Sequence, residues 1–368
     1  MAKPIIIKNI ISKYKKKIVV DGDKSLSIRF ALLASQATGK SRAYNLLKSE
    51  DVLSTLNCLK KLGVKIRWDK KSKFCEINGN GLNSYIYKDN LTLNGNNSGT
   101  CVRLLTSLLV NSPKKIKIVG DKSLSKRDMK RIIVPLKQFG ATFTPINKNN
   151  LPVYIRGTKY LRPINYEELI GSSQCKSSVM LAALSAPGIT RLKCKPSRNH
   201  TELFFKHLKI PIKIKKTKKF DFIEVEGKKN FKSFNYKIPT DISSSAFFIV
   251  LTLLSTNSSL IIKQVGINKS RIGVITILNK MGANIKLKNR KIYKGERIAD
   301  IYVKSKKELK SINCPSRLNS SAIDEFLIIF IAAAKAKGVS YFKNLEELNN
   351  KESRRLDLGS KILEMIGV

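Results

Sequence analysis

Histidine and paired cysteines are scarce in this chain of 368 residues. It has two histidines, and none of its six cysteines forms a CxxC pair, so we expect no metal site and reduced thiols in a cytosolic protein. The N-terminal segment lacks the apolar core and cleavage site of a signal peptide. The longest apolar runs, AFFIVLTLL (246–254) and FLIIFIAAA (326–334), are too short to span a bilayer, and we predict that both are buried helices.

Acidic residues are also few, which leaves a large excess of basic ones. Lys and Arg number 71 against 26 Asp and Glu, a net charge of +45. A field of this sign attracts nucleic acids, acidic lipids and phosphorylated metabolites. The lysines run through nearly every segment, without a single basic arm or an aromatic and basic surface motif. We therefore assign much of the charge to compositional drift at tolerant surface positions and the rest to attraction of small anionic substrates, rather than to specific nucleic-acid or membrane binding.

Two kinds of internal repeat organise the chain. GDKSLSIR (22–29) and GDKSLSKR (120–127) agree at seven of eight positions. A second pattern, a helix tail followed by glycine and a strand, occurs in LKKLGVKI (59–66), LKQFGATF (136–143), LNKMGANIKL (278–287) and, in degenerate form, HLKIPIKI (207–214). Glycine suits the position after a helix end, where a positive φ is cheap. The copies recur about every 70 residues, which predicts a mixed α/β fold of repeated modules.

The final residues, ILEMIGV (362–368), are another copy of this turn, but no strand follows Val368. A helix without the strand that it leads to leaves apolar surface and sheet-edge groups unpaired. We therefore expect the last module to be incomplete at its C-terminus.

Polar clusters precede several apolar, helix-like runs. GDKSLSIR places Lys24, Ser25 and Arg29 at a strand-to-helix turn. Hydroxyls and cations there suit a phosphate or carboxylate, although an ordinary capped helix start explains them equally well. The runs NNSGTCVRLL (96–105) and GSSQCKSSVML (171–181) repeat this arrangement, with free amides and neutral hydroxyls that attract or orient an anion.

The positions of the few acidic residues are informative. Asp241 and Asp324 each precede a helix-like run, where aspartate caps the helix. A carboxylate beside a strongly cationic site is also a candidate general base, and both roles stay open for Asp324. Glu352 lies among cations in KESRR (351–355), so an acid role requires that it be buried. We expect His200 to be a structural hydrogen-bonding residue.

Taken in order, these segments resemble the EPSP synthase family of enolpyruvyl transferases. The matching stretches are DGDKSLSIR (21–29), NNSGTCVRL (96–104), GDKSLSKRDM (120–129), SSQCKSSVMLA (172–182), SRNHTE (197–202), PTDISSSAFF (239–248), DEFL (324–327) and KESRR (351–355). None of these motifs would suffice alone, but their shared order over nearly the whole chain is a strong signal. The resemblance implies two domains of βαβαββ modules, one spanning 21–239 and the other combining 1–20 with 240–368.

The resemblance also implies a reaction: transfer of the enolpyruvyl group from phosphoenolpyruvate to the 5-hydroxyl of shikimate 3-phosphate by a monomeric enzyme without a cofactor. Phosphoenolpyruvate would be bound by Lys24, Asn97, Gly99, Arg127, Gln174 and Arg355. Shikimate 3-phosphate would be bound by Ser25, Arg29, Ser172, Ser173, Gln174, Ser197, Asp324 and Lys351. Asp324 would accept the 5-hydroxyl proton, and Glu352 and Lys24 would transfer protons at the methylene carbon.

The chain departs from the family pattern in two places that bear on activity. Arg354 replaces the acid of the family's KESDR motif, and the family's closing segment, with a DHR motif and a late lysine, is absent. Each missing donor would weaken transition-state stabilisation by about 2.7–4 kcal/mol. Three alternatives stay open. One is a truncated or decaying homologue that binds shikimate 3-phosphate with little turnover. Another is the related UDP-N-acetylglucosamine enolpyruvyl transferase, against which KESRR and SRNHTE argue. The third is a basic nucleic-acid-binding protein.

Overall fold

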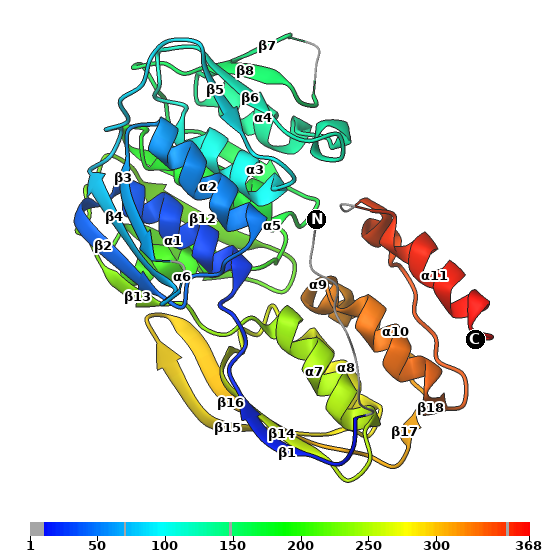
Figure 1. The fold of residues 1–368 in the computed structure, drawn as a ribbon. Coiled ribbons are helices and arrows are strands. Elements are labelled where there is room, and N and C mark those ends of the chain that lie inside the picture. Colours follow the sequence, from blue (N-terminus) through cyan, green and yellow to red (C-terminus); the bar gives the residue numbers. More distant parts are fainter. Residues whose placement is uncertain (1–10, 70, 147–148, 351–352) are drawn as a thin grey trace, which may run out of the picture.

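The computed structural model describes residues 11–69, 71–146, 149–350 and 353–368, and its ribbon is drawn in Figure 1. Two hydrophobic cores organise these residues. One core gathers buried side chains between Leu26 and Ile238, and the other gathers those between Ile242 and Leu348. We call the parts around them the first lobe and the second lobe; the first lies above the second in Figure 1.

Three four-stranded sheets with the same strand pattern build the first lobe. The first sheet has the order β13 (Asn235–Lys237), β2 (Thr38–Tyr44), β4 (Phe74–Asn80) and β3 (Lys65–Asp69). The second has the order β5 (Leu91–Asn94), β6 (Ile116–Val119), β8 (Val153–Arg156) and β7 (Thr142–Thr144). The third has the order β9 (Asn165–Glu168), β10 (Ile189–Cys194), β12 (Asp221–Glu226) and β11 (Ile212–Lys216). In each sheet the first pair is parallel and the other two pairs are antiparallel.

Helices pack between these sheets. They are α1 (Lys24–Gln36), α2 (Glu50–Lys61), α3 (Gly99–Leu108), α4 (Lys130–Gln138), α5 (Ser173–Ala183) and α6 (His200–His207), with a 3₁₀ turn η1 (Leu124–Lys126). Helices α1, α3 and α5 lie in the interior of the lobe, where α3 packs against both others, and nearly all their residues are buried. Their ends, rather than a whole face, therefore reach the surface.

The second lobe uses the same strand pattern once. Its sheet has the order β1 (Lys15–Ile18), β14 (Ser259–Gly266), β16 (Glu296–Lys304) and β15 (Asn284–Tyr293), with helices α7 (Ile242–Leu254) and α8 (Gly273–Lys280). Next come the two-stranded sheet of β17 (Leu309–Lys310) and β18 (Ala336–Lys337), the 3₁₀ turns η2 (Ser316–Leu318) and η3 (Glu346–Asn350), and the helices α9 (Asn319–Ala322), α10 (Phe326–Ala334) and α11 (Arg355–Met365). Helix α10 packs against both α7 and α11.

The described part of the chain passes between the lobes twice, before α1 and before α7. Strand β1 precedes the first lobe in sequence but pairs in parallel with β14 of the second, while β13 closes the first lobe beside β2. The two crossings are hydrogen-bonded to each other: the N–H of Asp23 donates to the carbonyl of Pro239 (2.8 Å), and the N–H of Asp241 donates to that of Asp21 (2.9 Å). These bonds hold the starts of α1 and α7 side by side.

The turns predicted from the repeated pattern are confirmed. Gly63, Gly140 and Gly282 each follow a helix end and have φ angles of 85°, 111° and 84°. In the degenerate copy Lys209 adopts the same left-handed conformation, with φ at 57°. The predicted mixed α/β class and the βαβαββ unit are confirmed as well.

The two long apolar runs form the predicted helices α7 and α10, but the prediction that these helices are buried is wrong in part. Each packs by one face only. Ile249 and Ile329 are buried, whereas Phe247 is 61% exposed and Leu327 is 38% exposed. None of the described helices is both long and apolar enough to cross a membrane.

The two copies of the GDKSLS repeat fold differently. In both, the aspartate accepts a hydrogen bond from the backbone N–H three residues later, at 2.8 Å for Asp23 and 2.7 Å for Asp121. The first copy continues into the 13-residue helix α1, whereas the second forms only η1 before Arg127. The shared residues therefore specify a capped turn, and the residues after it decide whether a helix follows.

Candidate active site

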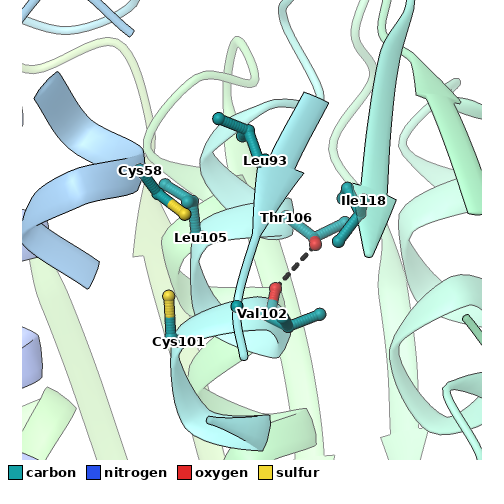
Figure 2. Close-up of a pocket in the computed structure, with 8 residues that line it drawn as sticks. Cys58, Leu93, Cys101, Val102, Leu105, Thr106 and Ile118 are labelled. Carbon is teal, nitrogen blue, oxygen red and sulfur yellow. Dashed lines mark hydrogen bonds between the residues drawn. The ribbon is translucent and has the colours of Figure 1, made fainter. Parts of the chain in front are cut away.

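A small pocket inside the first lobe, shown in Figure 2, is a packing gap. It lies between α2, α3 and the β5–β6 pair and is lined by apolar side chains, Cys58 and Cys101 among them. Its polar group is the hydroxyl of Thr106, which donates to the carbonyl of Val102 (2.6 Å). The volume is about 10 Å³, room for roughly one water molecule. This pocket is too small to be a substrate site.

A much larger cleft lies between the lobes. Its volume is about 990 Å³, and its walls come from both lobes, from Lys24 to His200 on one side and from Asp241 to Arg355 on the other. Clefts of this size between two folded units are typical of small-molecule sites.

Helix N-termini converge on this cleft from both lobes. The residues in the first turns of α1, α3, α5 and α7 that line it are Lys24, Ser25, Thr100, Ser173, Gln174, Ser243 and Ser244. A helix N-terminus carries a partial positive charge and unpaired amides, so it attracts anions. The interior position of α1, α3 and α5 is what brings three of these ends to one wall.

The side chains of the cleft are strongly basic. Among the described residues, its cationic side chains are Lys24, Arg29, Arg103, Arg127, Arg131, Arg198, Lys269, Arg271, Arg317 and Arg355, and its carboxylates are Asp241, Asp324 and Glu347. Ten described cations against three described carboxylates suit ligands that carry several negative charges.

Lys24 and Arg29 both lie on α1, in different surroundings. The Lys24 side chain is 44% exposed and lies 3.6 Å from the Asp51 carboxylate. Arg29 is buried and donates to the hydroxyl of Thr201 (2.9 Å) and to the carbonyl of Ser25 (3.1 Å). Burial lowers the pKa of Arg29 to about 10, so the guanidinium keeps its charge at neutral pH. Arg29 therefore anchors the wall, whereas Lys24 can reach a ligand.

Two arginines lie close to the start of α3. A Cβ atom at Gly99 would lie 3.1 Å from a guanidinium nitrogen of Arg127 and 3.5 Å from one of Arg103. The missing side chain of Gly99 thus leaves room for both cations. Gln174 joins this group to α5, because its Oε1 accepts from Arg103 (2.5 Å) and its Nε2 donates to the hydroxyl of Thr100 (3.0 Å).

A buried carboxylate shapes the loop before α5. The oxygens of Glu168 accept hydrogen bonds from the backbone N–H groups of Ile170 (3.1 Å), Gly171 (2.9 Å) and Ser172 (3.0 Å). Ser172 in turn caps α5 through its hydroxyl. The predicted ligands Ser172 and Ser173 are therefore presented by a loop that Glu168 holds in place.

Asp324 lies on the second-lobe wall and contacts an arginine from each lobe. One oxygen accepts from Arg198 (2.6 Å), and the other lies 3.4 Å from Arg355 at the start of α11. Helix α10 begins at Phe326 without a side-chain cap. Of the two roles that the sequence left open for Asp324, only a place in the cationic site agrees with these contacts. Asp241, by contrast, caps α7 as predicted.

His200 has the structural role predicted for it and links the lobes. Its Nδ1 lies 2.6 Å from Glu296, a residue of the second lobe. The other oxygen of Glu296 accepts from the side chain of Asn268 (3.0 Å), which also donates to Asn199 of the first lobe (2.9 Å). Two first-lobe residues thus share a buried polar network with two from the second.

Most predicted site residues lie together in this cleft: Lys24, Ser25, Arg29, Arg127, Ser172, Ser173, Gln174, Ser197, Asp324 and Arg355. Gly99 lies behind Arg127 rather than on the wall. Asn97 is also off the wall; its side chain donates to Asp121 (2.5 Å), the residue that begins the turn to Arg127. Lys351 and Glu352 lie outside the described residues.

Arg354, the departure from the family's motif, is largely exposed. Its Nε lies 2.7 Å from the carboxylate of Asp357, three residues further along. A neighbouring acid therefore compensates its charge.

Sequence reasoning assigned no role to several cations of the cleft: Arg103, Arg131, Arg198, Lys269, Arg271 and Arg317. Motif position could have found two of them. Arg198 lies within SRNHTE, and Arg103 lies one helical turn after Gly99. Lys269 and Arg271 lie in the loop between β14 and α8, which only the tertiary fold brings to the cleft.

The arrangement of lobes and cleft has counterparts among solved structures. An EPSP synthase from Acinetobacter baumannii superimposes with a TM-score of 0.85 at 36% identity, over 96% of this chain and 79% of that one. The enolpyruvyl transferase NikO from Streptomyces tendae superimposes with a TM-score of 0.67 at 13% identity, a likeness of fold alone. The chain therefore has the enolpyruvyl transferase fold.

Sequence comparison narrows this class. The family model for EPSP synthase (3-phosphoshikimate 1-carboxyvinyltransferase) matches residues 8–368. The 3-phosphoshikimate 1-carboxyvinyltransferase of Zymomonas mobilis is 38% identical over 96% of this chain and 77% of its own length. The 3-phosphoshikimate 1-carboxyvinyltransferase of Ruthia magnifica is 40% identical over 95% of this chain and 78% of its own length. The chain belongs to the EPSP synthase family.

Proposed function

We propose that this chain transfers the enolpyruvyl group of phosphoenolpyruvate to the 5-hydroxyl of shikimate 3-phosphate and releases inorganic phosphate. The cleft carries this proposal, because ten cationic side chains and four helix N-termini of the described part of the chain share it with Asp324. Both substrates are polyanions, which such a site attracts. Nothing in the comparisons favours the alternative of a homologue without turnover.

Phosphoenolpyruvate is assigned to the part of the cleft around α3 and α11. Lys24, Arg127 and Arg355 supply the cations for its phosphate and carboxylate. Gln174 orients it, while Gly99 and Asn97 support the Arg127 turn from behind.

Shikimate 3-phosphate is assigned to the starts of α1 and α5. Hydroxyl groups, an amide and two cations bind its phosphate and ring hydroxyls, and the residues are Ser25, Arg29, Ser172, Ser173, Gln174, Ser197 and, outside the described part of the chain, Lys351. Arg198, next to Ser197 and paired with Asp324, is an additional candidate. This placement sets the 5-hydroxyl against Asp324.

The chemistry then follows from the groups present. Asp324 accepts the 5-hydroxyl proton as that oxygen bonds to the central carbon of phosphoenolpyruvate, and the methylene carbon takes up a proton from Glu352 or Lys24. The central carbon gains cationic character during this addition. In the elimination that follows, the bond to phosphate breaks, a methyl proton returns to the protein, and the double bond re-forms. Arg127 and Arg355 stabilise the negative charge on the departing phosphate.

A coupled phosphate-release assay with the purified chain tests this function. We expect release that requires both substrates, and none when UDP-N-acetylglucosamine replaces shikimate 3-phosphate. Calorimetry of shikimate 3-phosphate binding accompanies the assay. Binding without release would favour the homologue without turnover, and the absence of both would refute the proposal.

The two cores support a division into domains at the chain crossings. We assign 21–239 to one domain and 1–20 with 240–368 to the other, since the core side chains divide between Ile238 and Ile242. Both walls of the cleft come from one chain, so a monomer with no cofactor and no specific nucleic-acid or membrane partner suffices for the reaction. We propose a cytosolic location, in keeping with the free cysteines.

The first prediction concerns the space beside Arg127. In the Gly99→Ala variant, the added methyl group displaces the Arg127 guanidinium from its place on the cleft wall. A hydrogen bond to a charged group contributes about 1.5–3 kcal/mol, so the KM for phosphoenolpyruvate should rise about 10–100-fold. The affinity for shikimate 3-phosphate, measured by calorimetry, should stay the same.

Gly266→Ala is the matched control, because the nearest atom to its added Cβ is 3.7 Å away. Steady-state kinetics of both variants decide the matter. An unchanged KM for phosphoenolpyruvate in Gly99→Ala would contradict the prediction that the room at Gly99 governs how Arg127 binds this substrate.

The second prediction concerns Glu168. In Glu168→Gln one carboxylate oxygen becomes an NH₂ group, which cannot accept the backbone N–H groups that it faces. The loop carrying Ser172 should loosen, and the KM for shikimate 3-phosphate should rise about tenfold, with kcat changed by less than about threefold.

Glu167→Gln is the adjacent control, because Glu167 is exposed and pairs with Lys193 on the surface (3.1 Å). Such pairs contribute little. If Glu168→Gln and Glu167→Gln had the same KM for shikimate 3-phosphate, the loop would not depend on the buried carboxylate.

A further inference from the structure

Arg271 is a buried arginine at the point where the two lobes meet. Its side chain is only 4% exposed. The guanidinium donates to the hydroxyl of Ser243 in the second lobe (2.6 Å) and lies 3.3 Å from the carboxylate of Asp23 in the first. It therefore contacts the first turn of α7 and the cap of α1 at the same time.

These two helix starts form one hydrogen-bonded unit. Asp23 caps α1 by accepting the N–H of Leu26 (2.8 Å), and Asp241 caps α7. Asp241 also accepts the backbone N–H of Lys24 (3.1 Å), so the cap of the second-lobe helix holds the first residue of the first-lobe helix. Arg271 lies between the two caps, 3.9 Å from the Asp241 carboxylate.

The charges around Arg271 make it the centre of this unit. Burial opposes its charge, but Asp23, Asp241 and Glu325 together raise the pKa of Arg271 above its ordinary value. Burial would likewise raise the pKa of Asp23, yet Arg271 and other neighbours lower it. Burial raises the pKa of Asp241 and of Glu325. Without Arg271, these buried carboxylates would repel one another.

The unit reaches the reacting groups on both walls. On one wall Lys24 is the first residue of α1. On the other, the hydroxyl of Ser243, to which Arg271 donates, is itself hydrogen-bonded to the buried carboxylate of Glu325. Glu325 directly precedes α10 and follows Asp324 in the chain, so its position sets that of Asp324.

We propose that Arg271 is a positioning residue for the transfer reaction, which fixes the separation of Lys24 and Asp324 across the cleft through Asp23, Ser243 and Glu325. This inference rests on the proposed function. The two guanidinium nitrogens that make contacts are directed to protein groups, so Arg271 acts through its neighbours and not by binding a substrate. A misplacement of about 1 Å at a reacting centre can cost about 100-fold in rate.

Three variants test the role. Arg271→Met keeps an unbranched stem but removes the guanidinium, with its charge and its donors; its kcat should fall about 100-fold, while the KM of each substrate stays within about threefold. Arg271→Lys keeps the charge with fewer directed donors and should restore about tenfold of that loss. Ser243→Ala removes one link of the chain to Glu325 and should lower kcat about three- to tenfold.

Kinetics are measured beside circular dichroism and shikimate 3-phosphate calorimetry, which report whether each variant is folded. An unchanged kcat in Arg271→Met, or a raised KM with unchanged kcat, would overturn the inference, the latter by making Arg271 a substrate contact. If Arg271→Met does not fold, the other two variants decide, and wild-type kcat in both would overturn it. An active wild-type chain with insensitive variants refutes this inference alone, whereas an inactive wild-type chain refutes the proposed function.

Discussion

The Asp324→Asn variant should lose about 10²–10⁴-fold in kcat, the range expected when a group that accepts a proton in the transition state is removed. Asparagine has nearly the same shape, and its one remaining oxygen can still accept from Arg198 or Arg355, which hold the carboxylate at 2.6 and 3.4 Å. It cannot take up the proton of the 5-hydroxyl. The loss should therefore fall on the chemical step.

The KM values distinguish the loss of a proton acceptor from damage to the binding site. In the native chain the Asp324 carboxylate neutralises part of the charge of two arginines. Its removal leaves a more positive cleft, so shikimate 3-phosphate should bind as tightly as before or tighter. A low kcat with an unchanged or lowered KM distinguishes a lost proton acceptor from a damaged binding site.

Single-turnover phosphate release, with both substrates in excess over their KM values, measures the effect. Asp69→Asn is the control, since Asp69 is an exposed carboxylate at the end of β3 that bonds to Ser72 and lies outside the cleft. Native-like kcat in Asp324→Asn would remove this residue from the mechanism.

Local sequence was sufficient for the modules and for much of the site. The turns at Gly63, Gly140 and Gly282 depend on a backbone conformation that glycine adopts at little cost, so a short pattern predicts them. The caps at Ser172 and Asp241 depend on neighbouring residues in the same way. Because both caps stand at helix starts that line the cleft, the same short motifs also mark the cleft wall.

What local sequence could not show depends on contacts between distant parts of the chain. Arg271 and Asp23 meet although 248 positions separate them, and the loop around Arg271 has no motif of its own. The exposure of Phe247 was also unpredictable, because a helix apolar all round gives no sign of which face will be covered. Both features depend on how the lobes and helices pack against one another. Short residue patterns do not determine that packing.

The largest expected effect on stability concerns a buried ion pair behind the shikimate 3-phosphate side. Lys176 and Glu202 lie 2.7 Å apart, with side chains 0% and 3% exposed. In Lys176→Met the Glu202 carboxylate stays buried without this partner, which should lower the free energy of unfolding by about 3–5 kcal/mol. Urea unfolding followed by circular dichroism measures the change.

The double variant Lys176→Met/Glu202→Gln separates charge from packing. With both charges removed, no carboxylate is left unpaired, and buried pairs can often be replaced by neutral residues at little cost. We therefore expect it to regain at least half of the lost stability. Recovery of stability should stay incomplete, because Glu202 also stabilises the charged form of the buried Arg29. It raises the pKa of Arg29 against the effect of burial. A double variant no more stable than Lys176→Met would mean that the unpaired charge was not the cause.

Function should not return with stability in this double variant. The ammonium of Lys176 also donates to the carbonyl of Ser197 (3.3 Å), in the loop that carries Ser197 and Arg198 to the cleft. Methionine at position 176 has no hydrogen-bond donor, so this contact with the Ser197 carbonyl is lost in the double variant as well. The KM for shikimate 3-phosphate should accordingly stay several-fold above the native value, while that for phosphoenolpyruvate equals the native value. If the KM for shikimate 3-phosphate were native once stability is regained, the ion pair would serve the fold alone, and the Ser197 loop would be positioned by other contacts.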